Sequence, residues 1–457
     1  MATDAPLPSP PRRAARALVL HPEWPLAVAL AALPVAVLGR LHADEVYQWL
    51  EPAFARAHGF GDLGWEWQVG IRNWAVPGLF AALLRLAAWL GIDDPVAARA
   101  VLAVPHALLA AAVLGAVRRF TARRLAPPWP AAGVWLFGTY GLFILFAGRS
   151  MAETYSGAAL VLAAERIDAR RALAAGVWMG LAVVFRYPSL VLVAGMALSL
   201  ALWRRELLAR AFLGGAVVLA LLGALDAATW GRPWHSLLAY LDFNILSSKG
   251  VEAFGAHPPS QYLPYLGRLA PWIAAGTWAA LRRGDGREVA LPVALYGAAL
   301  LVSPHKEGRF LYPAFLLLAL VAVPGWFRLA AAVRRPRVRA ALLAAGFAVS
   351  PTSYFLFQRT LRGDLFRAVV CAARASDLTG LVVVGEGRWD VAGYFFVGRE
   401  VPYDVCPDAA SCGAALGDRA FDYAVTRRKE LGPLLAAHGF ALARDGRSQL
   451  WRRPPAH

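Results

Sequence analysis

The chain is short of charged residues and of cysteines. Only 17% of its 457 residues are charged, whereas a soluble globular domain usually has about 25%. Three cysteines are too few for a disulfide scaffold. Cys406 and Cys412 lie close together in the sequence and could pair if their segment faces an oxidising compartment. The composition therefore excludes a small disulfide-rich protein and is unusual for a water-soluble enzyme.

Several common functional motifs are also missing. The sequence contains no GxxxxGK[ST] phosphate loop, no GxGxxG turn, no paired CxxC motifs and no visible internal repeat. ATP hydrolysis and dinucleotide redox chemistry therefore lack support. Because transporters often show repeat symmetry, the missing repeat also disfavours a transporter, which stays the less favoured alternative.

Apolar side chains, in contrast, are abundant. The chain is 58% hydrophobic, and runs approaching the roughly 20 residues that span a bilayer recur along it. The net charge of +17 comes from 47 Lys and Arg against 30 Asp and Glu. Because the arginines cluster in short loops between apolar segments, the positive-inside rule explains them better than nucleic-acid binding does. We therefore expect an integral, multi-pass helical protein of the plasma membrane, with lipids and not nucleic acid around it.

The basic loops give a topology. If they are all cytoplasmic, the apolar segments pair into out-and-back hairpins with about eleven spans. The run at 74–91 breaks this parity and contains Arg85, so we expect a re-entrant or interfacial helix there. We read the first apolar run as an uncleaved membrane helix and not as a cleaved signal peptide. The other expected spans include 130–147, 152–165, 172–186, 188–203, 211–226, 268–281, 289–303, 311–327 and 340–357.

This topology divides the chain into three parts. Residues 1–22 form a cytoplasmic tail, and residues 23–358 form a transmembrane catalytic domain with outer loops at 41–98 and 226–267. Residues 359–457 form an extracytoplasmic α/β domain. In that domain the pattern predicts strands at 381–385, 394–397 and 421–426, a helix at 428–438, and a hairpin at 440–451 that turns at Asp445-Gly446.

Two polar clusters lie where predicted helices reach the outer face. Asp44 and Glu45 follow the first helix, and His305, Lys306 and Arg309 follow a later one. Carboxylates at a membrane edge beside aromatic residues indicate a site. Acids and cations at the same face suggest chemistry on an anionic, lipid-linked substrate.

The motifs around these clusters resemble glycosyltransferase family 22, the mannosyltransferases of GPI-anchor and N-glycan precursor assembly. Four motifs occur in the family's order between about residues 20 and 330, which makes the match specific. Ala43 replaces the family's usual Pro, and the last hundred residues do not match its eukaryotic members. The matching segments are His42–Pro52, Glu66–Trp74, Phe243–Tyr262 and His305–Pro313.

The resemblance implies a GT-C fold, of a bacterial type given the Ala-, Arg- and Leu-rich composition. It also implies inverting, single-displacement transfer of a mannosyl or related residue from a polyprenyl-phosphate donor to a lipid-linked or glycan acceptor. A lipid-linked oligosaccharide polymerase or ligase is the alternative enzyme. An outward-facing site favours a lipid-phosphate donor, because nucleotide sugars are made in the cytoplasm.

The residues divide into candidate roles. A carboxylate near the acceptor hydroxyl suits a general base; Asp44 is the first candidate, because it matches the family's acid, and Glu45 is the second. The alternative is that this pair caps a helix or holds a loop cation. The candidates that would neutralise the donor phosphate are His305, Lys306, Arg309, Arg149 and Arg186.

These cations also have a purely structural interpretation. Lys306, Glu307 and Arg309 could form an ion network or reach lipid headgroups, and Arg149 could pair with Glu153 one helical turn on. Candidates for contact with the acceptor or sugar, against ordinary loop packing, are Glu51, Asn244, His257 and Tyr262. Tryptophans that either stack on sugars or anchor the interface are Trp65, Trp67, Trp74, Trp230 and Trp234.

No cofactor is required by the sequence. A divalent cation stays open, because Asp44, Glu45 and Glu51 could hold one, but no ligand spacing demands it.

Overall fold

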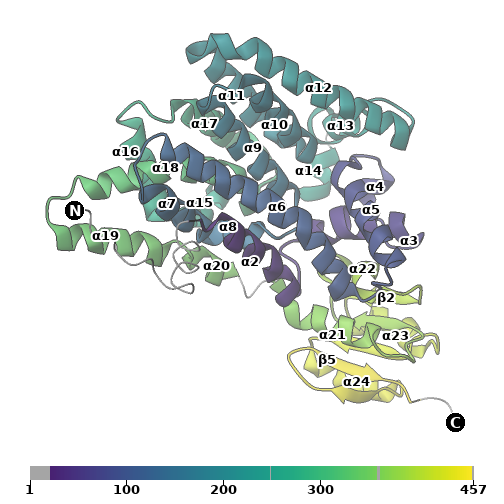
Figure 1. The fold of residues 1–457 in the computed structure, drawn as a ribbon. Coiled ribbons are helices and arrows are strands. Elements are labelled where there is room, and N and C mark those ends of the chain that lie inside the picture. Colours follow the sequence, from purple (N-terminus) through teal and green to yellow (C-terminus); the bar gives the residue numbers. More distant parts are fainter. Residues whose placement is uncertain (1–20, 248, 358–360, 455–457) are drawn as a thin grey trace.

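The structure, a computed structural model, describes residues 21–247, 249–357 and 361–454. A bundle of helices precedes a small five-stranded sheet at the C-terminal end of the chain (Figure 1). The helices of the first half are α2 (Glu23–Ala36), α3 (Glu51–His58), α4 (Trp65–Gln68), α5 (Ala75–Trp89), α6 (Pro95–Ala122), α7 (Trp129–Gly138), α8 (Gly141–Phe146), α9 (Ala152–Asp168), α10 (Ala172–Phe185), α11 (Leu190–Trp203) and α12 (Arg205–Trp230).

The second half completes the bundle and adds the sheet. Its helices are α13 (His235–Leu241), α14 (Lys249–Phe254), α15 (Leu263–Leu266), α16 (Pro271–Leu281), α17 (Arg287–Val302), α18 (Tyr312–Ala331), α19 (Pro336–Val349), α20 (Thr352–Phe357), α21 (Gly363–Ala373), α22 (Tyr394–Val397), α23 (Ala409–Gly417) and α24 (Gly432–Ala437). The strands are β1 (Leu381–Val384), β2 (Tyr403–Cys406), β3 (Tyr423–Thr426), β4 (Ala441–Arg444) and β5 (Gln449–Arg452).

Three stretches of the described chain are long and apolar enough to cross a membrane by length and composition: α6, α12 and Gly308–Ala331, which contains α18. Shorter apolar helices such as α2, α5 and α10 accompany them. Within the most apolar 18-residue window of each segment, 89% of Gly308–Ala331 is buried inside the protein, compared with 33% of α12. We infer that α18 is the central helix of the bundle and that α12 offers much of its surface to lipid.

Small residues allow the helices of the bundle to approach closely. A Cβ added at Gly176 of α10 would lie 1.8 Å from the carbonyl oxygen of Ala211 in α12. One added at Gly325 of α18 would lie 2.0 Å from the carbonyl oxygen of Gly276 in α16. Contacts between backbones at small residues are typical of helix pairs in membranes, where packing replaces the hydrophobic effect.

Two expected spans are broken, which corrects the prediction of continuous helices at 130–147 and 340–357. The first is divided into α7 and α8, and the second into α19 and α20. The breaks meet: the Gly141 N–H donates to the Ser350 carbonyl at 2.8 Å, and a Cβ at Gly141 would lie 2.5 Å from the Tyr354 nitrogen. The apolar composition of the two runs gives no signal for these breaks, because each break is formed by contacts with the other run.

The run at 74–91 forms α5, which packs within residues 41–98, the segment that the sequence predicts as the first outer loop. Its 15 residues cover about 22 Å at 1.5 Å per residue, less than the roughly 30 Å of a bilayer core. Val76, Phe80 and Leu84 join a buried cluster with Val46 and Leu50. A helix of this length is short for a full span, and its re-entrant or interfacial placement stays a prediction.

The C-terminal sheet has the order β2-β1-β3-β5-β4, with β1 parallel to β2 and β3, and β5 antiparallel to β3 and β4. The predicted strands at 381–385 and 421–426 and the predicted hairpin are confirmed. The predicted strand at 394–397 is wrong, because these residues form the helix α22. β2 and α23 were not predicted from the sequence. A disulfide between Cys406 and Cys412 joins these two elements.

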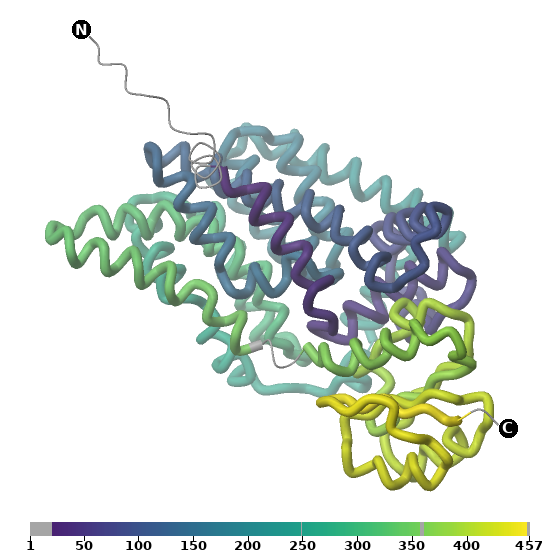
Figure 2. The backbone as a smooth tube through the Cα atoms, turned by 60° about the horizontal axis from the view of Figure 1, so that its bottom comes forward, coloured from purple at the N-terminus to yellow at the C-terminus, as the bar shows by residue number. Residues whose placement is uncertain are grey.

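One face of this sheet packs against the first outer loop. Leu381 and Val383 of β1 belong to the same buried cluster as Phe54 and Phe80, whereas Val382 and Val384 face a separate cluster with Cys412 and Leu435. Figure 2 shows the C-terminal domain beside the segment that follows α2. The domain therefore supports the loop that carries Asp44.

Candidate active site at the outer loops

The first outer loop begins at a tight approach between two distant segments. Gly39 has φ +123°, and a Cβ there would lie 2.0 Å from the Leu361 carbonyl oxygen, so glycine is needed on both counts. The Arg40 N–H donates to the same carbonyl at 3.0 Å. Asp44 then precedes the π-helix Glu45–Leu50, a type of turn that is often found at functional sites.

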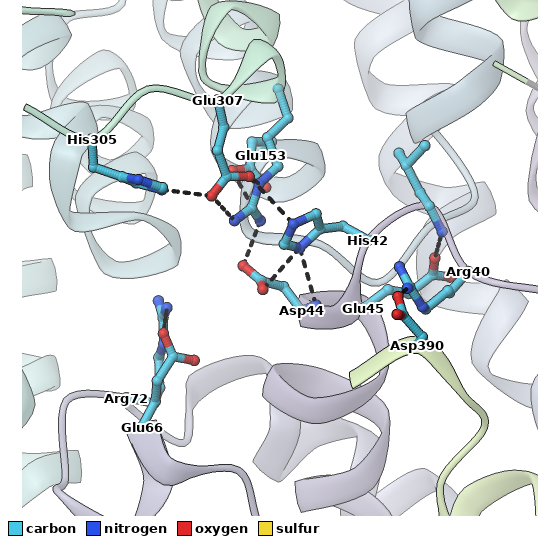
Figure 3. A network of polar contacts seen from close by, with 12 residues as sticks. Arg40, His42, Asp44, Glu45, Glu66, Arg72, Glu153, His305, Glu307 and Asp390 are labelled. Atoms are coloured by element: carbon cyan, nitrogen blue, oxygen red, sulfur yellow. Dashed lines mark hydrogen bonds and ion pairs between the residues drawn. The ribbon is translucent and has the colours of Figure 1, made fainter. Parts of the chain in front are cut away.

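Asp44 lies in a network with the second polar cluster (Figure 3). It forms an ion pair with Arg309, 265 residues away in the sequence. Its Oδ1 lies 2.9 Å from His42 Nδ1, and His42 Nε2 lies 3.3 Å from Glu307 Oε2. Arg309 Nε donates to Glu307 Oε2 at 2.6 Å. The structure thus joins the two clusters that the sequence analysis singled out.

Glu307 is the centre of this network. It accepts from Arg309 through both carboxylate oxygens, and its Oε1 also lies 2.8 Å from His305 Nε2. Glu153, at the start of α9, adds a second carboxylate 3.6 Å from Arg309. Arg309 therefore lies among three carboxylates, those of Asp44, Glu153 and Glu307, and donates a fork of hydrogen bonds suited to oxyanions.

The network keeps Asp44 and Glu307 ionised. Burial raises the pKa of Asp44, but the charges of Arg309 and His42 outweigh burial and hold that pKa well below its ordinary value. For Glu307, burial is likewise outweighed by Arg309 and the hydrogen bond from His305, so its pKa is lowered. Asp44 is consequently a carboxylate near neutral pH and is able to accept a proton.

Glu45 has a different environment from its neighbour. Its side chain is fully buried and pairs with Arg99 and, at 3.4 Å, with Arg149. Its Oε2 also accepts from the Leu41 N–H at 2.8 Å. These contacts favour, for Glu45, the structural alternative named above, in which the carboxylate holds a cation and is not the base.

The predicted phosphate-binding residues fall into three groups. His305 and Arg309 lie in the network around Glu307. Lys306 is 3% exposed and donates to the Ser303 carbonyl, and among the described residues no carboxylate pairs with it. Arg149 is buried and pairs outside this network, with Glu45 and the Gly39 carbonyl, whereas Arg186 is buried and pairs with Glu153.

Arg186 belongs to the network through Glu153, so Glu153 pairs with Arg186 and not with Arg149, the alternative partner considered from the sequence. Its Nε donates to Glu153 Oε1 at 3.3 Å, and its Nη1 donates to the Tyr296 hydroxyl at 3.0 Å. Because Glu153 also pairs with Arg309, Arg186 and Arg309 share one carboxylate.

The predicted acceptor-binding residues are dispersed. His257 lies at the network, with its ring centroid 5.8 Å from that of His305. Tyr262 is buried in the core of the bundle. Asn244 is exposed and donates to the Tyr240 carbonyl. Glu51 lies at the C-terminal domain, away from this network.

Glu51 holds α22 in place. Its carboxylate accepts from the N–H groups of Tyr394 at 2.9 Å, Phe395 at 3.0 Å and Asp62 at 2.9 Å. This explains why 394–397 is a helical turn and not a strand: its first N–H groups have a carboxylate partner from another domain. Burial raises the pKa of Glu51 to about 7, despite these three donors.

A pocket opens beside the network, between the first outer loop and the junction of α10 and α11. It is partly open to solvent. Arg72 reaches into this region and donates to Glu66 at 2.6 Å, and both side chains extend toward the Asp44 network (Figure 3). The residues lining it are Gln48, Trp49, Trp67, Arg72, Asn73, Val76, Pro77, Ala152, Val184, Phe185, Arg186 and Tyr187.

The sequence analysis did not assign roles to Glu66, Arg72 or Tyr296. Glu66 and Arg72 lie in one of the matching family segments, which was the available signal. Tyr296 lies within an apolar helix, and nothing in the sequence distinguishes it. For metals, the described residues contain no group of three His, Cys, Asp or Glu that could hold an ion.

Comparisons with known proteins agree with this architecture. The profile of the Alg9-like mannosyltransferase family matches residues 24–361. GPI mannosyltransferase 3 of Yarrowia lipolytica is 30% identical over 301 residues, which are 61% of this chain and 57% of that protein. The Drosophila melanogaster GPI mannosyltransferase 3 is 27% identical over 59% of this chain and 50% of its own length. The matches thus span little more than half of these relatives.

The fold itself matches a solved structure over nearly its full length. The crystal structure of ArnT from Cupriavidus metallidurans bound to undecaprenyl phosphate aligns with a TM-score of 0.58 and 15% identity, over 97% of this chain and 98% of that one. The apo form aligns with a TM-score of 0.56. The chain is therefore a polytopic membrane protein of the GT-C fold with a small C-terminal α/β domain. It belongs to the Alg9-like mannosyltransferase family.

Proposed function

We propose that this protein is a membrane glycosyltransferase that moves a mannosyl or related residue from a polyprenyl-phosphate donor to a hydroxyl of a lipid-linked or glycan acceptor. The observation that carries the proposal is the partly buried Asp44–Arg309 ion pair, which joins two distant loops at one site. A base for the acceptor and a cation for the leaving group are the two parts that such a transfer needs.

The chemistry is a single displacement with inversion. Asp44 accepts the proton of the acceptor hydroxyl, whose oxygen forms the new bond to C1 of the sugar. The bond from C1 to the phosphate oxygen breaks, and its electron pair leaves with the polyprenyl phosphate. Asp44 then returns the proton to water.

Arg309 links proton transfer to Asp44 with binding of the leaving phosphate. In the free protein it pairs with Asp44, Glu153 and Glu307. A donor phosphodiester that enters beside Lys306 brings one negative charge, and further charge builds on its oxygens as the bond to C1 breaks, so the guanidinium shifts toward the phosphate. Asp44 then loses its strongest cationic partner and becomes a stronger base as the substrate binds. Lys306, which has no carboxylate partner in the described part of the chain, supplies the second positive charge.

The site's position supports a lipid donor. Both clusters follow apolar helices that end at the same face of the bundle, so a polyprenyl tail remains in the membrane while its phosphate reaches Lys306. The crystallised GT-C neighbour holds undecaprenyl phosphate. We place the active face and the C-terminal domain outside the cytoplasm of the plasma membrane, where a disulfide such as Cys406–Cys412 persists.

The donor class is tested by reconstituting the purified protein in nanodiscs with membrane-extracted acceptor lipids. Polyprenyl-phosphate-mannose and GDP-mannose are supplied in parallel, both with labelled mannose. We expect labelled product from the lipid donor alone. Product from GDP-mannose, or transfer of preassembled oligosaccharide blocks in place of single sugars, would overturn the proposal.

A further inference from the structure

We infer that Asp226 of α12 is a positioning residue, which sets Arg72 beside Asp44 through a chain of buried hydrogen bonds. This inference rests on the proposed function, because it concerns the base of that reaction. Asp226 is fully buried in the last turn of α12. Its Oδ2 accepts from the Ser236 N–H at 2.9 Å and from the Ser236 hydroxyl at 2.6 Å, and its Oδ1 has no hydrogen-bond partner among the described residues. A carboxylate buried in this way is costly in a membrane protein, so we expect it to have a role.

The hydrogen bonds that lead away from Asp226 run in one direction. The single hydroxyl proton of Ser236 goes to Asp226. At the next contact, of 2.5 Å, the Tyr187 hydroxyl therefore donates to Ser236 Oγ. Tyr187 in turn accepts from Asn73 Nδ2 at 2.9 Å. The charge of the carboxylate thus fixes the order of donors along the chain, from Asn73 through Tyr187 and Ser236.

Asn73 ends this chain in the segment that carries Arg72. Its Nδ2 also donates to the Val184 carbonyl at 2.8 Å, and its Oδ1 accepts from the Ala75 N–H at 3.1 Å, where α5 begins. Both amide protons and the amide oxygen are therefore in use. Removal of the Tyr187 contact would leave one of these groups unpaired and free the side chain that follows Arg72 in the sequence.

The corner between α12 and α13 holds the same segment directly. Trp230, one helical turn after Asp226, donates its indole N–H to the Arg72 carbonyl at 3.0 Å. Its ring stacks on that of His235, with the centroids 5.4 Å apart. Gly70 has φ +73°, and a Cβ there would lie 2.4 Å from His235 Nε2. The corner therefore fixes the backbone at Arg72 and just before it.

Arg72 places a second cation near the proposed base. Its side chain extends toward Asp44 from the segment between α4 and α5 (Figure 3). Burial raises the pKa of Asp44, and the cations around it, Arg72 among them, lower it. When Arg309 turns to the donor phosphate, Arg72 stays in place, because α12 holds its backbone and Glu66 pairs with its guanidinium at 2.6 Å. A fixed cation keeps Asp44 ionised until the proton of the acceptor arrives.

The test combines two substitutions in the full-length protein. Ser236→Ala removes the middle hydroxyl of the chain but keeps the backbone N–H that binds Asp226. We expect it to lower kcat/KM for transfer about 3- to 10-fold, the range for one neutral hydrogen bond. In the Arg72→Gln background, which has already lost the charge, the same change should alter kcat/KM by less than about 2-fold, the limit of additivity errors. Equal factors in the two backgrounds, or wild-type transfer by Ser236→Ala, would overturn the inference.

A pair of variants at the other end of the chain separates positioning from folding. Asp226→Asn keeps an oxygen that accepts from Ser236, whereas Asp226→Leu keeps the size and removes the acceptor. We expect Asp226→Asn to recover most of the transfer that Asp226→Leu loses, when transfer is measured per folded molecule. Equal transfer by the two variants would overturn the inference.

Ser350→Ala is the matched control. Ser350 is also fully buried, and its hydroxyl donates to the Leu136 carbonyl at 3.0 Å, in a different part of the bundle. We expect it to change the thermal midpoint as Ser236→Ala does and to leave kcat/KM unchanged. A loss of transfer in Ser350→Ala as large as in Ser236→Ala would show that Ser236 acts only through stability. No transfer by wild-type protein from any polyprenyl-phosphate sugar would instead refute the proposed function.

Discussion

Glu45 and Asp44 are adjacent acids that we expect to respond in opposite ways to the same substitution. The Glu45 side chain is fully buried beside two cations that are also buried: the side chains of Arg99 and Arg149 are 4% and 3% exposed. Replacing one partner of a buried ion pair leaves the other charge uncompensated and costs about 3–5 kcal/mol. Glu45→Gln should therefore lower the free energy of unfolding by about this amount while the fraction that remains folded still transfers sugar.

The assay is equilibrium unfolding in mixed micelles, followed by tryptophan fluorescence, with transfer measured per folded molecule. Glu206→Gln is the matched control, because the pair of Arg170 and Glu206 is more than half exposed and is worth about 0–1 kcal/mol. If Glu45→Gln unfolds like the control and yet abolishes transfer, Glu45 is the catalytic base and our assignment of Asp44 is wrong.

Three further predictions concern the docking of the C-terminal domain, the helix packing and the donor site. Burial raises the pKa of Glu51 from 4.5 to about 7, so the folded protein binds more protons than the unfolded one in that window. The stabilisation from protonated Glu51 is fully present below pH 4.5 and is lost as the pH rises through about 7. Glu51→Gln should remove this pH dependence of the free energy of unfolding, and an unchanged pH dependence would contradict the assignment. Gly176→Ala should destabilise the protein by about 1–3 kcal/mol, because its Cβ meets the Ala211 carbonyl. Gly297→Ala, whose Cβ meets nothing within 4 Å, should not, and equal thermal midpoints would refute the packing. Lys306→Met should reduce kcat/KM for the lipid donor by about 10- to 150-fold, the range for a charge-assisted hydrogen bond; an unchanged value would remove Lys306 from the donor site.

The helices and the positions of their ends could be predicted from the sequence, because apolar runs and basic loops are local signals. The first apolar run corresponds to α2, and the later hairpin around 172–203 corresponds to α10 and α11. The breaks at Gly141 and between α19 and α20 could not be predicted, because each is set by a hydrogen bond and a backbone contact to the other segment.

The candidate site could be predicted from the sequence about as well as the fold could. The two charged clusters could be identified by their position at helix ends, but which charges pair depends on tertiary structure. Glu307 lies between two cations in the chain and becomes the centre of the network, while Arg149, four residues from Glu153, pairs with Glu45 instead. Glu51 was grouped with the substrate-binding residues because of its motif. Its contacts with Tyr394 and Phe395, more than 340 residues away, have no signal in the sequence.

The role of Asp44 as the base is the central claim. It is tested most directly by comparing purified wild-type and Asp44→Asn protein for transfer from synthetic polyprenyl-phosphate-mannose. Asparagine keeps the size and can still accept a hydrogen bond from Arg309, but it cannot take a proton near neutral pH. We predict that Asp44→Asn folds, binds the lipid donor and loses transfer by at least about 100-fold, the lower range of general-base contributions. Transfer at the wild-type rate in folded Asp44→Asn protein would contradict the account.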